Sequence, residues 1–214
     1  MLQSLKSHGD LHLARKAFHV ISILVILMCM IFLPRVVSWS IYFLVAMPLL
    51  LLDLLRPHFP KLNRFSLKII GPVIRKHEVR QLSGSSYAIL GIGFTYFIFP
   101  PVVAQLAVLF LAIGDPTASF FGLLFGKIKL FGKKSLEGAL AGIAFCSIAA
   151  LIYFSLNEFE FSAEWSQLIT YSLSCGVIGG VAELIPVFGM DDNLSQPLLS
   201  SGLLSLFFFF MGGL

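Results

Sequence analysis

Apolar stretches, most of them about the length that crosses a lipid bilayer, recur throughout this chain and leave little room for anything else. Of its 214 residues, 57% are hydrophobic, only 12% are charged and 22 are Phe, and the mean hydropathy is +0.92. A transmembrane helix needs about 20 predominantly apolar residues, so the sequence predicts an all-α, polytopic bundle of about seven spans. These spans are expected at residues 17–33, 36–55, 86–99, 102–122, 138–156, 167–185 and 197–211. We therefore expect one integral-membrane domain over residues 1–214 and a multi-pass membrane protein.

One segment between the predicted spans is amphipathic rather than uniformly apolar. Over residues 60–78, the basic residues Lys61, Arg64 and Lys68 are interspersed with apolar ones such as Phe65. A basic amphipathic helix lies on an anionic membrane surface, with its apolar face in the headgroup region. The segment therefore predicts one interfacial helix.

The Lys and Arg residues divide unequally between the two sides of this topology. Fourteen of the fifteen fall on the side of the N-terminus, and only Arg35 falls on the other. Residues 157–165 carry three Glu and no basic residue, which suits the side of Arg35. Because basic residues near span ends stay in the cytoplasm, the N-terminus is predicted to be cytoplasmic. The basic residues follow the membrane topology and form no separate stripe, so no nucleic-acid partner is expected.

Asp115 lies inside a predicted span and is the first candidate for a functional residue. A carboxylate in a hydrophobic helix costs about 2.5–3.5 kcal/mol on insertion scales unless it faces a paired or wet interior. On the same predicted helix Gly114, Ala118, Gly122 and Gly126 recur at every fourth residue, a pattern that favours close helix packing.

Further polar clusters reach the same predicted cytoplasmic side from other parts of the chain. They contain Arg15, Lys16, His19, Glu78, Gly84, Glu183, Asp191, Asp192 and Asn193. Convergence of several clusters on one side of the membrane favours a single site over unrelated polar residues.

The segment that starts the fifth predicted span has the features of an anion site. Lys133 and Lys134 supply ammonium groups and Ser135 a hydroxyl, next to the backbone N–H groups of a helix start. We therefore predict that these three residues bind phosphate. The segment is not a Walker A loop, because the glycine spacing differs and Ile128 stands where Ser or Thr belongs. Glu137 is interpreted either as a cap of the following helix or as a metal ligand.

Asp191, Asp192 and Asn193 provide three oxygen ligands in one short segment. Magnesium that bridges phosphates takes one or two carboxylates and keeps several waters. Asp191 and Asp192, together with Asp115, are therefore predicted to hold Mg²⁺. The same three residues are also ordinary turn formers, which is the alternative interpretation.

Five short motifs in sequence resemble those of a known family. They are Arg15-Lys16-x-x-His19, Glu78 followed by Leu82-Ser83-Gly84, Gly114-Asp115-Pro116-x-Ala118-Ser119, Lys134-Ser135-x-Glu137-Gly138, and Glu183-x-x-Pro186 followed by Asp191-Asp192-Asn193. This order is similar to that of the polyprenol kinase family, which includes dolichol kinases, phytol kinases and CTP-dependent diacylglycerol kinases. The resemblance implies a membrane enzyme that transfers the terminal phosphate of a nucleotide, typically CTP, to a lipid alcohol with a divalent metal.

The candidate residues then divide into three expected roles. The expected catalytic residues are Asp115, Lys134, Glu137, Asp192 and Glu78. The expected nucleotide contacts are Arg15, Lys16, Gly114, Lys133, Ser135 and Asn193, and the expected Mg²⁺ ligands are Asp115, Asp191 and Asp192. The lipid would enter sideways from the bilayer, and its hydroxyl proton would pass to Glu78, Glu183, Asp191 or Asp192.

Two other functions compete with the kinase. Parts of the Gly114-Asp115 and Lys134-Ser135 motifs are similar to phosphatidate cytidylyltransferases, which use CTP on a lipid phosphate. Those enzymes typically end with His-Gly-Gly-x-x-Asp-Arg-x-Asp, and the corresponding residues 181–193 depart from that pattern. The other alternative is a small transporter with Asp115 and Glu183 as coupling carboxylates, but the chain shows no clear internal repeat. The oligomeric state stays open.

Overall fold

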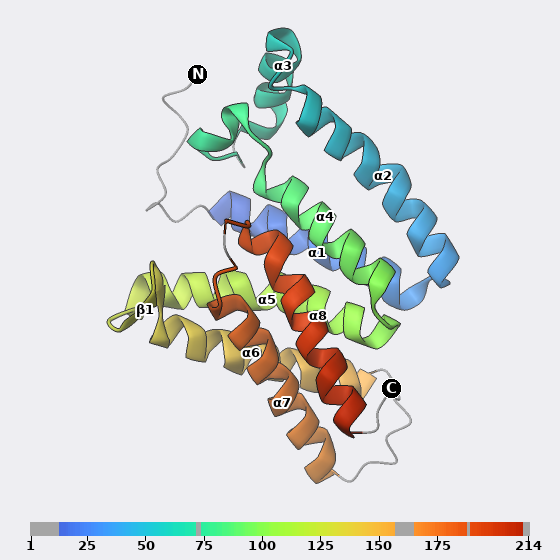
Figure 1. Ribbon diagram of the computed structural model, residues 1–214, viewed down its shortest axis with the longest axis vertical. Coiled ribbons are helices and arrows are strands. Elements are labelled where there is room, and N and C mark those ends of the chain that lie inside the picture. Colours follow the sequence, from blue (N-terminus) through green and yellow to red (C-terminus); the bar gives the residue numbers. More distant parts are fainter. Residues whose placement is uncertain (1–12, 72–73, 157–164, 188, 212–214) are drawn as a thin grey trace.

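The computed structural model describes residues 13–71, 74–156, 165–187 and 189–211, and these residues are predominantly helical (Figure 1). The helices are α1 (Leu13–Phe32), α2 (Arg35–Leu55), α3 (Pro60–Ile70), the 3-10 helix η3 (Lys76–Arg80), α4 (Gly84–Ile98), α5 (Pro101–Phe125), α6 (Leu136–Leu156), α7 (Trp165–Leu184) and α8 (Asp192–Met211). The predicted all-α fold class is confirmed. In addition, β1 (Lys129–Phe131) and β2 (Lys134–Ser135) form a short antiparallel hairpin between α5 and α6.

The predicted spans agree in position with seven of these helices. Within the described residues, α1, α2, α5, α6 and α8 are long and apolar enough to cross a membrane. α4 is apolar but has only 15 residues, and α7 has 20 residues but does not belong to that set. Five spans therefore have the expected properties, and membrane crossing by α4 and α7 stays a prediction.

The interfacial segment differs from the expectation of one helix over residues 60–78. The α-helix α3 ends at Ile70, and η3 begins separately at Lys76, while residues 72–73 lie outside the described part. The physical reason is Pro72, which has no backbone N–H with which to continue the helix. Phe65 and Ile69 on α3 are exposed, at 63% and 65%, as an interfacial helix requires.

Helix α5 is at the centre of the bundle. It contacts α1, α4, α6, α7 and α8, and Val103, Leu106 and Phe110 along it are completely buried. Helix α2 instead lies along one edge of the molecule (Figure 1) and exposes many large apolar side chains. In a bilayer these side chains contact lipid at no cost, because lipid tails are as apolar as the side chains are.

Small residues bring α5 and α6 together, as the glycine spacing predicts. A Cβ added at Gly138 would lie 2.6 Å from the backbone oxygen of Ala118 and 3.1 Å from Cα of Gly122. A Cβ at Gly142 would lie 3.3 Å from that of Ala118. The predicted close helix packing is therefore confirmed for this face of α5.

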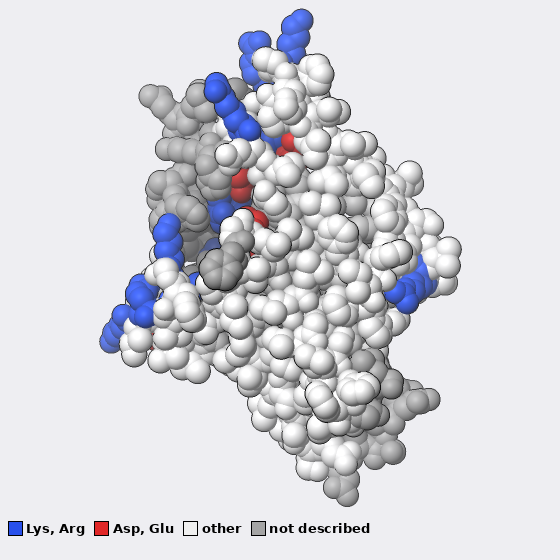
Figure 2. Space-filling view, in the orientation of Figure 1, with Lys and Arg blue, Asp and Glu red and all other residues white. Residues whose placement is uncertain are grey.

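Basic residues gather at one end of the molecule. Figure 2 shows blue side chains along the upper and left edges, an extensive white surface over most of the remainder, and one blue group at the right. Arg35, at the α1–α2 junction, donates to the backbone oxygen of Tyr96 at 3.1 Å and begins the helix α2. Most of the acidic segment 157–165, namely residues 157–164, lies outside the described residues.

Labelling of introduced cysteines tests the predicted orientation. Lys129→Cys in the hairpin is expected to react with a membrane-impermeant maleimide only when the cytoplasmic side is accessible. Val36→Cys, at the opposite end of the bundle and 77% exposed, is expected to react only from the other side. The wild type is the background control for the native thiols, of which Cys146 and Cys175 are buried and Cys29 is half-buried. Labelling of both variants from one side would contradict the topology.

The glycine contact between α5 and α6 gives a stability prediction. Gly138→Ala places a methyl group against backbone that cannot move away, so we expect the free energy of unfolding in detergent to fall by about 1–3 kcal/mol. Gly202→Ala is the matched control, because no described heavy atom lies within 4 Å of a Cβ added there. Equal melting temperatures for the two variants would refute the packing interpretation.

Candidate functional site

The predicted polar clusters come from six segments and gather at the basic end of the bundle. They lie at the start of α1, from η3 to the start of α4, just past the middle of α5, on β2, at the end of α7 and at the start of α8. Figure 2 shows acidic side chains in a hollow between the basic ones at this end. The convergence expected from the topology is thus present in the fold.

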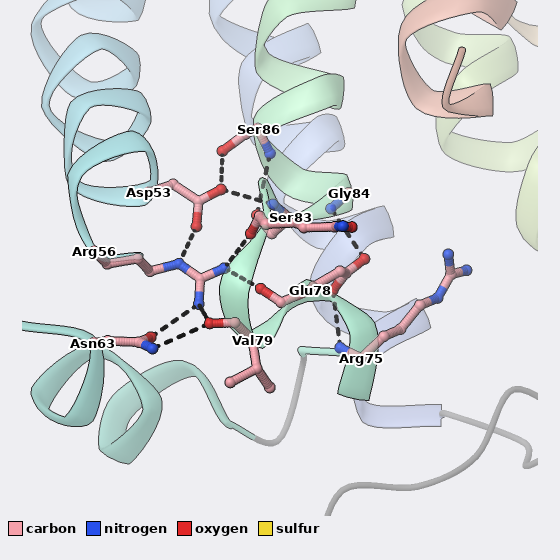
Figure 3. A network of polar contacts seen from close by, with 10 residues as sticks. Asp53, Arg56, Asn63, Arg75, Glu78, Val79, Ser83, Gly84 and Ser86 are labelled. Atoms are coloured by element: carbon pink, nitrogen blue, oxygen red, sulfur yellow. Dashed lines mark hydrogen bonds and ion pairs between the residues drawn. The ribbon is translucent and has the colours of Figure 1, made fainter. Parts of the chain in front are cut away.

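Glu78 connects α1 to the segment that begins α4. One carboxylate oxygen lies 3.8 Å from Nη2 of Arg15 and accepts the Gly84 N–H at 3.2 Å. The other accepts the Arg75 N–H at 2.9 Å, and the residue is only 3% exposed. Figure 3 shows this carboxylate between Arg75 and Gly84. Glu78 is therefore a fully engaged acceptor rather than a solvent-facing acid.

Gly84 is the point where three polar side chains meet. A Cβ added there would lie 2.9 Å from Nη2 of Arg15, 2.9 Å from Nδ2 of Asn193 and 3.5 Å from Oε1 of Glu78. Asn193 also donates to the Gly84 backbone oxygen at 3.1 Å. The glycine of the predicted Leu82-Ser83-Gly84 motif lets these side chains approach the backbone, and a larger residue would displace the ends of Arg15 and Asn193.

Asp53 and Arg56 hold this segment from the side of α2, and neither is among the predicted site residues. Nε of Arg56 lies 2.5 Å from Oδ1 of Asp53, and Nη2 donates to the backbone oxygens of Glu78 at 2.7 Å and Gln81 at 2.9 Å. The second Asp53 oxygen accepts the N–H of Ser83 at 2.7 Å. Figure 3 shows these contacts on one side of the segment and the Glu78 carboxylate on the other. The signal was available, because Asp53, like Asp115, is a carboxylate inside a predicted span.

Asp115 faces the α1 cluster. Its Oδ2 lies 3.9 Å from Nε2 of His19, and its side chain is 32% exposed. That His19 nitrogen is buried and has no hydrogen-bond partner among the described residues. Asp115 is also close enough to Arg15, Lys16 and Glu183 for their charges to interact. It therefore links the basic residues of α1 to the acidic end of α7.

Lys134 joins the hairpin to the two C-terminal helices. Its Nζ lies 3.5 Å from Oε1 of Glu183 and 3.2 Å from Oδ2 of Asp192, and it donates to the Glu183 backbone oxygen. The side chain of Asp192 is 47% exposed, whereas that of Glu183 is 8% exposed. One ammonium group is thus shared between two carboxylates, one from α7 and one from α8.

The remaining phosphate candidates have structural contacts. Oγ of Ser135 accepts the Gly138 N–H at 3.2 Å and so caps the start of α6. Both oxygens of Glu137 lie 3.3 Å from the backbone nitrogen of Ile128, which precedes the hairpin and is not part of α6, so the choice between a helix cap and a metal ligand stays open. Lys133 is exposed beside the hairpin turn, where Gly132 has a φ of +54° that a residue with a side chain rarely adopts.

Two further residues predicted to contact the nucleotide, Lys16 and Gly114, pack against other residues of the protein. Nζ of Lys16 lies 6.0 Å from the ring centroid of Phe120, a cation–π distance. Gly114 is buried in α5, where a Cβ would lie 2.8 Å from Sγ of Cys146. Its position is explained by helix packing.

The predicted metal ligands do not form a closed site. Among the described residues no group of three or more His, Cys, Asp and Glu side chains could hold a metal ion. Asp191 accepts the Asn193 N–H at 3.0 Å, as expected of a turn at a helix start. Burial raises the pKa of the Asp191 carboxyl above its usual value, and the nearby charges of Asp192 and Glu78 raise it further, against the opposing effects of the Asn193 N–H and Arg75.

Curated relatives provide an independent comparison. A CTP-dependent diacylglycerol kinase 1 of Schizosaccharomyces pombe is 32% identical over 160 residues, which cover 72% of this chain and 73% of the relative. Proteins of the same name from Eremothecium gossypii and Saccharomyces cerevisiae are 30% and 29% identical over 71% and 72% of this chain. This chain spans just over half the length of these two relatives, 53% and 58%. No protein-family model and no solved structure matches the chain.

Removal of the Arg56 side chain tests the role of the α2 pair. Arg56→Met leaves the buried Asp53 carboxylate without its cation, so the free energy of unfolding should fall by about 3–5 kcal/mol. The control is Arg64→Met on the exposed side of α3, which should change it by less than about 0.5 kcal/mol. Thermal unfolding in detergent measures both. Equal stability of the two variants would show that the network contributes little.

Proposed function

This chain belongs to the CTP-dependent diacylglycerol kinase family, and on that basis we propose that it transfers the terminal phosphate of CTP to the hydroxyl of a membrane lipid alcohol such as diacylglycerol. The observation that carries the proposal is Lys134, whose ammonium lies within 3.5 Å of carboxylates from α7 and α8. A half-buried lysine beside one buried and one partly exposed carboxylate, at the basic end of a helical bundle, combines a phosphate ligand with cation ligands. Transfer of a phosphoryl group needs little else from a protein, because catalysis is mostly positioning and charge neutralisation.

The residues present fit a magnesium ion. Asp115 and Asp192 have side chains 32% and 47% exposed, and their oxygens are the hard ligands that Mg²⁺ takes alongside phosphate oxygens and water. We assign the ion to Asp115 with Asp191 or Asp192. When bound, it would neutralise charge on the triphosphate.

The chain's own residues supply the remaining requirements. Lys134 binds phosphate oxygens, and Arg15, fixed by Glu78, adds positive charge on the α1 side. The lipid oxygen attacks the terminal phosphorus, the bond to the bridging oxygen breaks, and CDP leaves. Glu78 is engaged in three contacts, which leaves Glu183, Asp191 and Asp192 as candidates for accepting the hydroxyl proton.

Transfer of labelled phosphate tests this function directly. The purified protein is incubated in lipid micelles with Mg²⁺ and CTP labelled on either the gamma or the alpha phosphate, with diacylglycerol, a polyprenol or phosphatidate as acceptor. We expect gamma label on an alcohol lipid. Alpha label on phosphatidate would instead establish a cytidylyltransferase, and transfer of neither label would contradict the proposal for these acceptors.

Variants in the same assay test the assigned residues. Lys134→Ala and Asp115→Asn are expected to lower kcat/KM on the order of 100-fold, because each removes a charge that acts on the transferred phosphate. Lys129→Ala, an exposed lysine of the same hairpin, is the matched control and should retain wild-type activity. Wild-type activity in Asp115→Asn would refute this mechanism.

A further inference from the structure

An apolar groove lies between α1, α2 and α4, away from the polar cluster. Its volume is about 150 Å³, and its walls include Cys29 and Met30 of α1, Ala46 and Leu49 of α2, and Ile89 of α4. An apolar cavity of this size stays dry and accepts small hydrocarbon groups. The groove is therefore suited to hydrocarbon and not to a polar ligand.

The hydroxyl groups in the groove wall are bonded to protein atoms. Oγ of Ser38 and the Tyr96 hydroxyl are 2.5 Å apart, and the Tyr42 hydroxyl donates to the backbone oxygen of Ile89. These bonds satisfy the polar atoms within the protein, so an apolar occupant would leave none of them unpaired.

The groove opens towards lipid. Val25, Val45 and Leu49 line it and are 58%, 55% and 51% exposed, and α2 lies at the edge of the molecule (Figure 1). In a bilayer, a groove on this surface is reached from the hydrocarbon region without passage through water. A lipid tail could enter it sideways.

The same three helices connect the groove to the polar cluster. At 1.5 Å per residue, Val25 lies about 9 Å along α1 from His19, and Ile89 lies about 7.5 Å along α4 from Gly84. On α2, Leu49 is about one turn from Asp53. The groove thus begins one to two helical turns below the groups that surround Gly84, at the depth where acyl chains continue from a lipid headgroup.

We propose that this groove binds a segment of one acyl chain of the diacylglycerol-type substrate, so that the hydroxyl is held at the end of the groove nearest Gly84. The inference rests on the proposed lipid kinase activity and adds to it the place where the tail is held. The groove then determines which acyl chains are accepted, while the polar cluster determines the reaction. Bulk phospholipid, which has the same tails, is the competing occupant that the test must separate.

Adjacent residues of α2 provide a matched pair for the test. Val45→Trp fills the groove, whereas Leu44→Trp adds the same side chain at a residue that is 77% exposed and does not line the groove. We expect Val45→Trp to raise the KM for dioleoylglycerol at least tenfold. Its KM for CTP and its kcat with a short-chain dibutyrylglycerol should stay within twofold of wild type. Leu44→Trp should match wild type in all three, and equal effects of the two variants would overturn the proposal.

Photolabelling of the wild type keeps the proposal testable if Val45→Trp does not fold. A diacylglycerol with a diazirine in the middle of one chain should label the groove residues of α1, α2 and α4. Dioleoylglycerol should reduce this labelling more than equal phosphatidylcholine does. Labelling outside the groove, or equal competition by the two lipids, would overturn the acyl-chain site. Failure of wild-type phosphate transfer to diacylglycerol would separately contradict the proposed function.

Discussion

The ion pair between Asp53 and Arg56 fixes a segment on which the site depends. Its side chains are 8% and 0% exposed, so neither charge is solvated by water and each must be satisfied within the protein. Arg56 donates to the backbone of the segment that carries Glu78, and Asp53 accepts from the segment that starts α4. Glu78 in turn contacts Arg15 of α1. The peripheral helix α2 is thereby connected to the polar cluster by directional bonds rather than by apolar packing.

The sequence predicts the helices well because hydrocarbon imposes one rule on each span, namely a sufficient length of apolar residues. It also predicts the packing of α5 on α6, because residues four apart such as Ala118 and Gly122 share a helix face. The prediction of a single helix over residues 60–78 was wrong, because it followed the amphipathic pattern and took no account of Pro72. The membrane sidedness and the number of crossings beyond five stay predictions.

The candidate site was predicted less completely than the helices. Residue type and membrane side identified Arg15, Glu78, Asp115, Lys134 and Asp192, because a charge beside an apolar span needs a partner. Residue type and membrane side could not distinguish Lys134, which lies between two carboxylates, from its exposed neighbour Lys133. Ser135 and Glu137 also accept from local backbone N–H groups, contacts that the apolar pattern does not encode, and their predicted ligand roles stay predictions. Arg56 directly follows a predicted span, and its partners became visible only in three dimensions.

The contacts of Lys134 have a consequence for the order in which ligands assemble. Its ammonium is shared between Glu183 and Asp192, so these three groups carry one net negative charge when both carboxyls are ionised. A phosphate that takes this lysine away leaves two carboxylates facing a new anion. A divalent cation that arrives with the phosphate removes that repulsion. We therefore expect the phosphate and the divalent cation to bind together, and each to bind weakly when the other is absent.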